Sequence, residues 1–259
     1  MIDGGHLHLS VPDSTRFGYR IARGQVDETV AGEEVLADIE KLRADIAIFR
    51  CPAGCLRQVR SLVESGLPPI HADTLVYYRC DLPARLDTGL RGPAPDVPAS
   101  VRRATLDDGV AIAGIVRSGF DGYRNHYHAN PLLREQDIIE GYIEWARSYT
   151  RPQTGKCTWV VETERGVVGF ATCGEYSGQR EVEIVLNAVD PTHNGKGLYS
   201  LLLHSLLNHY ACSGFDTLAI STQVWNYKVQ RVWMRCGLLM SHAFDTYHVN
   251  SRHLCRGNT

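Results

Sequence analysis

The stretch THNGKGLYS (Thr192–Ser200) lies between two apolar runs. The run before it, EIVLNAV (183–189), favours a strand, and the run after it, LLLHSLL (201–207), favours a helix. Glycines at such a junction let the backbone approach a ligand, and the first free N–H groups of a helix attract an anion. The stretch therefore has two interpretations, which are a cradle for an anionic group and a tight turn that only joins strand to helix.

The glycine spacing narrows the kind of anion site that the stretch can form. Gly195-Lys196-Gly197 does not match the phosphate loop, in which four residues separate a glycine from Gly-Lys and a serine or threonine follows. It does not match G-x-G-x-x-G either. The spacing alone leaves both interpretations open, so the surrounding elements have to decide between them.

Hydrophobic periodicity predicts the order of the surrounding elements. Residues 90–100 (LRGPAPDVPAS) contain three prolines and are expected to be a linker. Before the linker we expect a helix running into a strand at 34–49, a helix at 55–66 and a strand at 73–82. After it we expect strands at 100–105, 157–163, 167–176, 180–189, 216–222 and 241–250, and helices at 107–120, 132–149, 196–214 and 226–237. This order predicts an α/β fold with a mixed central sheet flanked by helices, preceded by a small N-terminal α/β unit.

Size, charge and hydropathy exclude several classes of protein. The chain has 259 residues, of which 44% are hydrophobic and 22% charged, and this suits one large or two small domains. Its net charge of −2 gives no argument for a nucleic-acid partner, and no apolar run approaches the roughly 20 residues of a membrane helix. The first residues lack the basic and apolar regions of a signal peptide, so none is expected. The scattered cysteines, which are expected to be reduced, make a cytoplasmic protein the expectation.

Cysteine spacing gives no sign of a metal site. Eight cysteines are scattered along the chain, and only Cys51 and Cys55 are close together. Zinc needs two further ligands, and no second pair has the matching spacing. We therefore expect reduced, mostly buried thiols and no metal.

The strand, glycine loop and Leu-rich helix together resemble motif A of the GNAT acyltransferase superfamily. Residues 226–238 (NYKVQRVWMRCGL) resemble a second signature of that family, an Asn-led helix that ends in a Gly-apolar step. The resemblance covers roughly 99–250 and implies the GNAT fold, with acetyl-CoA or another acyl-CoA as co-substrate. It also implies which residues contact that co-substrate: Asn187, Ala188, Val189, Asn194, Gly195, Lys196, Gly197, Leu198, Tyr199, Ser200, Asn226 and Trp233.

The whole chain looks like the TDP-fucosamine acetyltransferase group, which acetylates the amine of a nucleotide-linked aminodeoxy sugar. That group also has an N-terminal α/β unit before its catalytic domain. The pieces that match are RFGY (16–19), LVYYRCDL (75–82), Phe120, YIEW (142–145) and Thr222-Gln223. On this basis we expect an N-terminal unit at 1–92, which is partly GNAT-like, and a catalytic GNAT domain at 98–259.

Three positions depart from the family pattern. Asn194 stands where a long Arg or Gln is usual, and Tyr199 stands where Gly or Ala is usual. The tyrosine that acts as general acid in the family falls at Trp233. An indole N–H is far too weak an acid to protonate a thiolate, so another group or water has to supply that proton.

The amine acceptor has to lose a proton before it attacks, and two regions offer a base. Glu183 lies on the strand that leads into the loop, and it is either a base acting through water or a solvated strand residue. The segment YRNHYHAN (123–130) offers His126 and His128, because histidine titrates near neutral pH. The other expected acceptor contacts are Tyr123, Arg124, Asn125, Tyr127, Asn130 and Tyr247.

Segment 123–130 and the last strand also have interpretations other than acceptor binding. The segment 123–130 is otherwise an ordinary polar surface loop or an incidental His-x-His metal contact. Tyr247 and His248 lie on the last strand, whose alternation sends them to opposite faces, so at most one of them faces an acceptor.

The sequence predicts an acetyl-CoA-dependent N-acyltransferase that acts by direct attack in a ternary complex. The expected acceptor is a small-molecule amine on a nucleotide-linked sugar, and the expected partners include neither nucleic acid nor membrane. One alternative is another small amine or an amino-acid derivative as acceptor. A second alternative is a non-catalytic acyl-CoA sensor, which Trp233 favours. A homodimer is left open.

Overall fold

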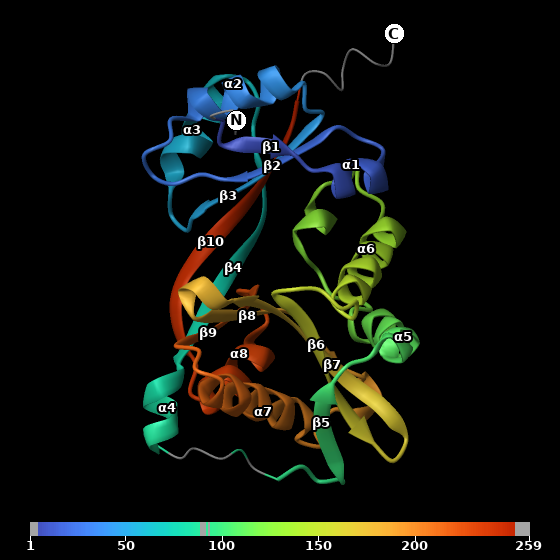
Figure 1. Cartoon of the computed structure of the whole chain (residues 1–259). Coiled ribbons are helices and arrows are strands. Elements are labelled where there is room, and N and C mark those ends of the chain that lie inside the picture. The colour runs from blue at the N-terminus through green and yellow to red at the C-terminus, as the bar shows by residue number, and fades with distance from the viewer. Residues whose placement is uncertain (1–4, 89–91, 93, 252–259) are drawn as a thin grey trace. The chain divides into compact units, whose positions relative to one another are not determined.

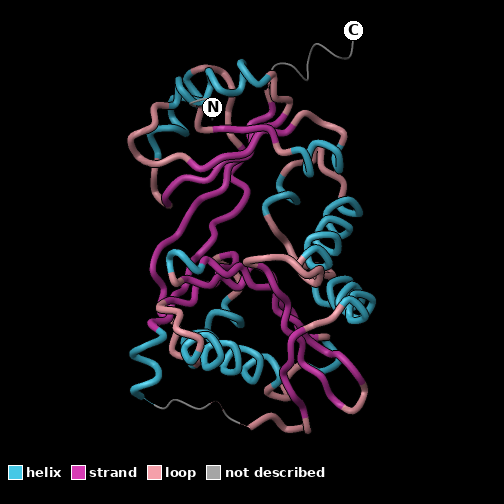
Figure 2. Tube along the Cα trace, viewed as in Figure 1, coloured by secondary structure: helices cyan, strands magenta, loops and turns pink. Residues whose placement is uncertain are grey.

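Residues 5–88, 92 and 94–251 are described in the computed structural model. Helices and strands follow each other along the chain as Figure 1 labels them and as Figure 2 colours them. The helices are α1 (Val11–Phe17), α2 (Gly32–Leu42), α3 (Leu56–Glu64), α4 (Leu82–Thr88), α5 (Gly109–Gly119), α6 (Glu135–Ser148), α7 (Leu198–Cys212) and α8 (Tyr227–Arg235). The strands are β1 (Leu7–Leu9), β2 (Ile21–Gln25), β3 (Ile46–Pro52), β4 (Ile70–Asp81), β5 (Ala99–Arg103), β6 (Lys156–Thr163), β7 (Gly166–Tyr176), β8 (Glu181–Val189), β9 (Thr217–Gln223) and β10 (Leu239–Asn250).

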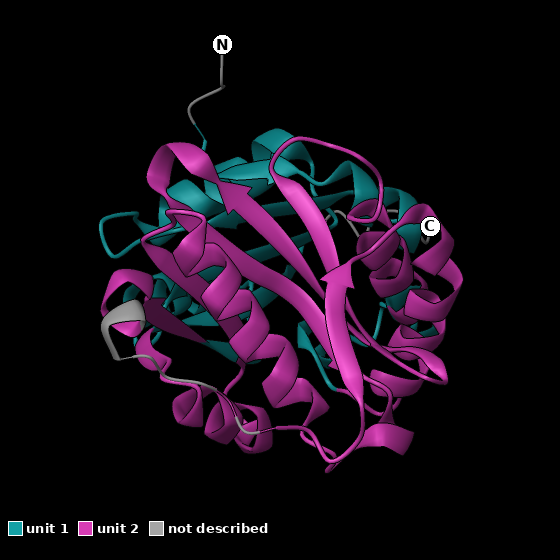
Figure 3. Cartoon of the chain, turned by 60° about the horizontal axis from the view of Figure 1, so that its bottom comes forward, with its two compact units in different colours: residues 1–76, 124–138, 242–259 teal, residues 77–123, 139–241 magenta. Residues whose placement is uncertain are grey.

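The chain folds into two compact units that are interleaved in sequence. Unit 1 contains residues 1–76, 124–138 and 242–259, and unit 2 contains residues 77–123 and 139–241, as Figure 3 shows in two colours. The division expected from the sequence, 1–92 and 98–259, follows chain order instead. It stays a prediction about modules, and residues 89–91 and 93 of the expected linker lie outside the described residues.

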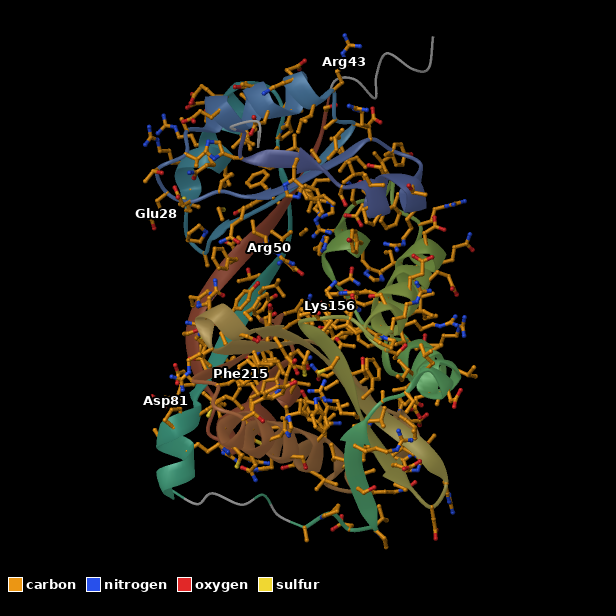
Figure 4. The ribbon with its side chains drawn as sticks, viewed as in Figure 1. Glu28, Arg43, Arg50, Asp81, Lys156 and Phe215 are labelled. Atoms are coloured by element: carbon orange, nitrogen blue, oxygen red, sulfur yellow. The ribbon has the colours of Figure 1, made fainter. Side chains whose placement is uncertain are left out.

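The sheet of unit 1 separates an apolar face from a polar one. β1 pairs antiparallel with β2, β2 pairs parallel with β3, and β3 pairs antiparallel with β10. Phe49 and Tyr247, which are register partners, belong to a core with residues of α2 and α3, and their rings stack 5.7 Å apart. Arg50 of β3, labelled in Figure 4, is the register partner of Thr246 and lies on the other face, because side chains alternate along a strand.

The sheet of unit 2 has a helix on each face. β5, β6, β7 and β8 form an antiparallel meander, and β9 adds to β8 in parallel. Val160 packs beneath α5 with Phe170, whereas the neighbouring Trp159 contacts Tyr210 of α7. Adjacent strand residues therefore face opposite helices. Figure 1 shows α5 and α7 on the two sides of this sheet. Phe215, labelled in Figure 4, closes the α7 side by packing edge-on against Tyr210.

The elements expected after the linker are all confirmed in type and order, and so is the mixed sheet flanked by helices. β1, α1, β2 and α4 were not predicted. A local signal for α1 exists, since the Ser10 side chain accepts from the Asp13 N–H and a proline follows in the first turn. The short strands β1 and β2 have no such signal, because three to five residues are too few for a clear period.

Candidate functional site

The stretch Thr192–Ser200 forms a turn that delivers the chain from β8 into α7. Asp190 caps a short 3₁₀ helix, Pro191–His193, through its contacts with Thr192, and these hydrogen bonds lower the pKa of the Asp190 carboxyl. Gly195 and Gly197 then adopt left-handed φ values of 81° and 74°. Gly197 is the N-cap of α7. Both glycines are therefore required by backbone geometry, because other residues rarely adopt these angles.

The surroundings of this turn fit an anionic ligand. A Cβ built at Gly195 meets no atom within 4 Å, so the space over the turn is open. A Cβ at Gly197 lies 3.2 Å from Pro95 Cα, so the chain packs closely on its other side. The first N–H groups of α7 have no acceptors within the helix, and its dipole favours negative charge there. Lys196 adds a positive charge to this partly exposed turn.

β8 and β9 separate beside the turn. Their parallel pairing runs from Glu181–Thr217 to Ile184–Ile220 and then stops, although β8 continues to Val189 and β9 to Gln223. On its other edge β8 has a bulge, since Leu186 faces Thr172 and Ile184 faces Cys173, which leaves Val185 between them without a partner in β7. Beyond Ile184 and Ile220 the two strands no longer pair with each other, and this region, called the opening below, has strand edges whose backbone groups suit an extended polar ligand.

Three side chains meet on the α7 and α8 side of this opening. The Trp233 indole N–H donates to the Tyr199 hydroxyl (2.8 Å), and that hydroxyl donates to Asn187 Oδ1 (2.8 Å). Burial raises the pKa of the Tyr199 phenol. Trp233 is 1% exposed and packs edge-on against Tyr78 at 5.3 Å. Position 199 thus places a tyrosine hydroxyl against the indole that occupies the expected acid position.

A second polar group forms at the end of β9. The Tyr123 hydroxyl contacts Thr222 Oγ1 (3.2 Å) and donates to Gln223 Oε1. Asn226 Nδ2 also donates to Thr222 Oγ1 (3.0 Å). The Trp225 ring lies 5.2 Å from that of Tyr123 and is 42% exposed, so it presents an aromatic surface to solvent.

Glu183 lies one residue before the point where β8 and β9 separate. It is half-buried, and it interacts with Tyr176 and Tyr149, since a hydrogen bond to Glu183 and its charge contribute to the raised pKa of the Tyr176 hydroxyl. Burial is the main cause of that shift. The carboxylate is therefore held near two phenols next to the opening, and its role as base stays a prediction.

Segment 124–130 belongs to unit 1, and six of its seven residues are buried or half-buried, which differs from an ordinary surface loop. Arg124 is exposed. Asn125 is 4% exposed and accepts from the Tyr127 N–H (2.9 Å), while His128 Nδ1 accepts from the Asn125 N–H (3.2 Å). Asn125 and His128 thus cap the 3₁₀ helix His126–Ala129, and this capping uses side-chain atoms that an acceptor ligand would need.

Tyr127 connects the segment to α1 and β2. Its hydroxyl donates to Asp13 Oδ1 (3.0 Å) and accepts from Arg23 Nη1 (2.7 Å), and Arg23 also pairs with Asp13 at 2.9 Å. Its ring packs on Phe17 at 5.2 Å. A half-buried tyrosine whose hydroxyl both donates and accepts in this way fixes the segment in place.

His126 meets His248 rather than solvent. His126 Nδ1 lies 2.9 Å from His248 Nε2, and the exposed fractions of the two side chains are 5% and 0%. Burial, reinforced by Arg23, lowers the pKa of His126 well below its usual value and that of His248 to about 3. Alternation sends Tyr247 into the apolar core, so His248 is the member of that pair that faces polar groups.

The contact between His248 and Asn130 determines which ring nitrogens of His248 and His126 carry the protons. Asn130 Nδ2 donates to His248 Nδ1 (3.4 Å) and to Asn250 Oδ1 (2.8 Å). A neutral His248 then bears its proton on Nε2 and donates to His126 Nδ1, which leaves His126 with its proton on Nε2. In this arrangement His126 presents a donor, and its accepting nitrogen is occupied. Its predicted role as base stays a prediction that this geometry does not favour.

The remaining predicted co-substrate contacts divide between backbone and side-chain roles. Leu198 is 1% exposed, so only its backbone N–H is available at the turn. Ser200 Oγ faces Cys236 Sγ at 3.9 Å. Asn194, Ala188 and Val189 are exposed or half-buried and lie along the loop and the end of β8. His248 was absent from the predicted site residues, although the alternation along the last strand is a signal that could have placed it.

The described part of the chain contains neither a cluster of metal-ligand side chains nor a membrane-spanning helix. No three His, Cys, Asp or Glu side chains gather there as a metal site requires. None of the helices in residues 5–88 and 94–251 is long and apolar enough to cross a bilayer.

Comparison with known proteins finds one family model that is similar to part of this chain. The model described as the Acetyltransferase (GNAT) family matches residues 121–238, which include the turn, the opening and α8. No curated protein matches the chain. The match supports the GNAT superfamily and an acyltransferase as the class of enzyme. The nucleotide-aminosugar subgroup stays a prediction.

Solved structures share the fold at low sequence identity. A GCN5-related N-acetyltransferase from Kribbella flavida has a TM-score of 0.59 and 14% identity, over 91% of this chain and 83% of that one. A tandem GNAT protein from the clavulanic acid biosynthesis pathway has a TM-score of 0.60 and 12% identity, over 90% of this chain and 76% of that one. A functionally unknown conserved protein from Staphylococcus epidermidis has a TM-score of 0.61 and 11% identity, over 97% of this chain and 93% of that one. These similarities confirm the expected GNAT fold.

Proposed function

We propose that this chain, whose residues 121–238 match the GNAT family, transfers an acyl group from acyl-CoA to an amine. The observation that supports this most directly is the turn at Gly195–Gly197 beside the opening between β8 and β9. The N–H groups at the start of α7 suit the pyrophosphate of CoA. The unpaired strand edges suit the amides of its pantetheine arm.

The chemistry proposed is direct attack of the amine on the thioester. Backbone N–H groups near the end of β8, at Asn187–Val189, orient and polarise the thioester carbonyl. Glu183 accepts the ammonium proton through water, because it lies beside the separation of the strands. Bringing both reactants into one site replaces a bimolecular encounter with a positioned attack.

The acceptor proposed is the amine of a nucleotide-linked aminodeoxy sugar. It is supported by the resemblance of the chain to enzymes that use such sugars. The exposed Trp225 ring beside Tyr123 adds support, since aromatic faces bind sugars and bases by stacking. Another small amine remains the alternative acceptor. A non-catalytic acyl-CoA sensor remains the second alternative, since Trp233 stands at the expected acid position.

A binding and turnover series tests this function. Thermal unfolding is followed with acetyl-CoA and with CoA, and thiol release is then measured with TDP-linked aminodeoxyhexoses and a set of small amines. We expect stabilisation by both CoA species, followed by thiol release with the TDP-linked amines. Absence of stabilisation would contradict the acyl-CoA assignment. Stabilisation without thiol release from any amine would favour the sensor.

A further inference from the structure

The hydroxyl of Tyr199 has an unusual position for the first turn of a helix. It lies between β8 and α8, because it donates to Asn187 Oδ1 and accepts from Trp233 Nε1, each at 2.8 Å. Asn187 belongs to the part of β8 that has already separated from β9. The hydroxyl therefore bridges one strand residue and one helix residue beside the separated part of β8, rather than bonding within its own helix.

We propose that the Tyr199 hydroxyl is the acid that protonates the departing sulfur, an inference that rests on the acyltransferase function proposed above. An arm that enters the opening from the turn at Gly195–Gly197 passes the first turn of α7, in which Tyr199 lies. The sulfur at its end then needs a proton donor within the opening. Tyr199 supplies an O–H there, and Trp233 supplies a second donor behind it.

The proton and the electron pairs balance within this scheme. The amine nitrogen forms its bond to the acyl carbon, and the carbon–sulfur bond breaks with its electron pair on sulfur. Tyr199 Oη turns from Asn187 and gives its proton to that sulfur. The Trp233 N–H stays hydrogen-bonded to the resulting phenolate. The proton lost by the nitrogen returns through water to the phenolate, so the products are a neutral amide and a thiol.

Neighbouring donors are less suitable for this role. The Trp233 N–H is too weak an acid and is already donated to Tyr199. The Tyr123 hydroxyl is directed at Thr222 and Gln223, at the end of β9. Cys236 is 0% exposed, and burial raises the pKa of its thiol. Burial raises the pKa of the Tyr199 hydroxyl as well, whereas the hydrogen bond from Trp233 opposes that shift because it stabilises the phenolate.

The test measures the pKa of the CoA thiol when CoA is bound to the full chain, by thiolate absorbance. A phenol that donates to sulfur stabilises the thiolate, so Tyr199→Phe is expected to raise the pKa of the bound thiol by about one unit. With acetyl-CoA and a TDP-linked aminodeoxyhexose, the same variant is expected to lower kcat by ~100-fold with little change in KM for acetyl-CoA.

Tyr210→Phe is the matched control, because it removes another buried hydroxyl from the same helix, one that donates to Glu175 instead. It should leave the pKa of the bound thiol unchanged. The variant Tyr199→Phe/Trp233→Tyr returns a hydroxyl to the opening from α8 and is expected to recover at least ten-fold of the lost kcat. Circular dichroism and CoA affinity verify that each variant is folded.

The outcomes separate this inference from the proposed function. Loss of CoA binding in the unmodified chain contradicts the acyl-CoA function itself. CoA binding with an unchanged thiol pKa in Tyr199→Phe, or a shift seen only in Tyr123→Phe, overturns the role of Tyr199 and leaves the function standing. A shift in Tyr199→Phe that the double variant reverses supports the inference.

Discussion

At the scale of single residues, the buried pair His126 and His248 shows how a polar residue can be held without solvent. Each imidazole has a partner, since His248 accepts from Asn130 and donates to His126. Burial disfavours the charged form of both, and Arg23 adds repulsion. The pair is therefore stable only while both rings are neutral.

A dependence of stability on pH follows from that pair. Unfolded histidines have a pKa of about 6.5, whereas these two have lower pKa values in the native state, about 3 for His248. Below pH ~6.5 the unfolded chain binds more protons, so the free energy of unfolding falls as pH falls, by ~1.4 kcal/mol per pH unit for each histidine. Urea unfolding between pH 7 and 5 measures this slope. In His248→Asn the slope should be shallower, and an equal slope in that variant would contradict the assignment.

Glu183 gives the second prediction at this scale. Glu183→Gln keeps the shape of the side chain and removes the carboxylate that lies beside the separating strands. We expect kcat/KM for the amine to fall by ~100-fold while the affinity for acetyl-CoA is unchanged, because the base acts on the acceptor alone. Glu181→Gln is a control on the same strand, since Glu181 pairs with Arg79 instead. Equal losses in both variants would point to a general effect of charge.

At the scale of elements, the junction of β8 and α7 depends on two glycines that differ in their surroundings. Both have left-handed φ values, but a Cβ at Gly195 enters open space, whereas one at Gly197 meets Pro95 Cα at 3.2 Å. The first position is open toward a ligand, and the second is packed against the chain. Substitution of Gly195 is therefore expected to affect ligand binding, and substitution of Gly197 is expected to affect stability.

Alanine at each position tests this distinction. Each substitution costs ~1–2 kcal/mol of stability, because a left-handed backbone disfavours a Cβ. Gly197→Ala should lose more stability than Gly195→Ala, since its Cβ also meets Pro95.

Gly195→Ala should weaken CoA binding at least ten-fold, because its Cβ occupies the space over the turn. Gly178→Ala is the control, with open space and no left-handed angle. CoA titration and urea unfolding measure both effects, and unchanged CoA affinity in Gly195→Ala would argue against the turn as cradle.

At the scale of the whole molecule, the two units are not consecutive pieces of chain. β10 lies at the end of the sequence, but Phe244–Asn250 pair with β3 in unit 1. The segment 124–138 also belongs to unit 1. Unit 1 therefore requires both the N-terminal and the C-terminal parts of the chain.

Cutting the chain at the proline-rich segment tests this arrangement. A fragment 98–259 lacks β3, so Tyr247 and Val249, which are 7% and 0% exposed in the full chain, lose their core. Exposure of each side chain costs ~1.5–3 kcal/mol of the free energy that burial contributes, and we expect the fragment to aggregate. If the full chain is folded first and then cut at a protease site inserted after residue 92, the halves should co-elute in size-exclusion chromatography. Separation into two soluble halves would instead support 1–92 and 98–259 as independent modules.

The sequence by itself determined the local elements and the character of the turn. Periodicity located the strands and helices from β5 to β10, and the glycines between β8 and α7 identified the turn, because these signals depend only on neighbouring residues. The short β1 and β2 had no readable period. Chain order also suggested two consecutive domains, since nothing local records that β10 returns to β3.

Only the tertiary structure decided which side chains meet. It placed the Tyr199 hydroxyl against Trp233 and Asn187, residues that are 34 and 12 positions away. It placed His126 against His248, 122 positions away, within a network of polar side chains. Spacing along the chain fixes contacts within a helix or a strand, whereas contacts between elements depend on packing directions that no short stretch contains.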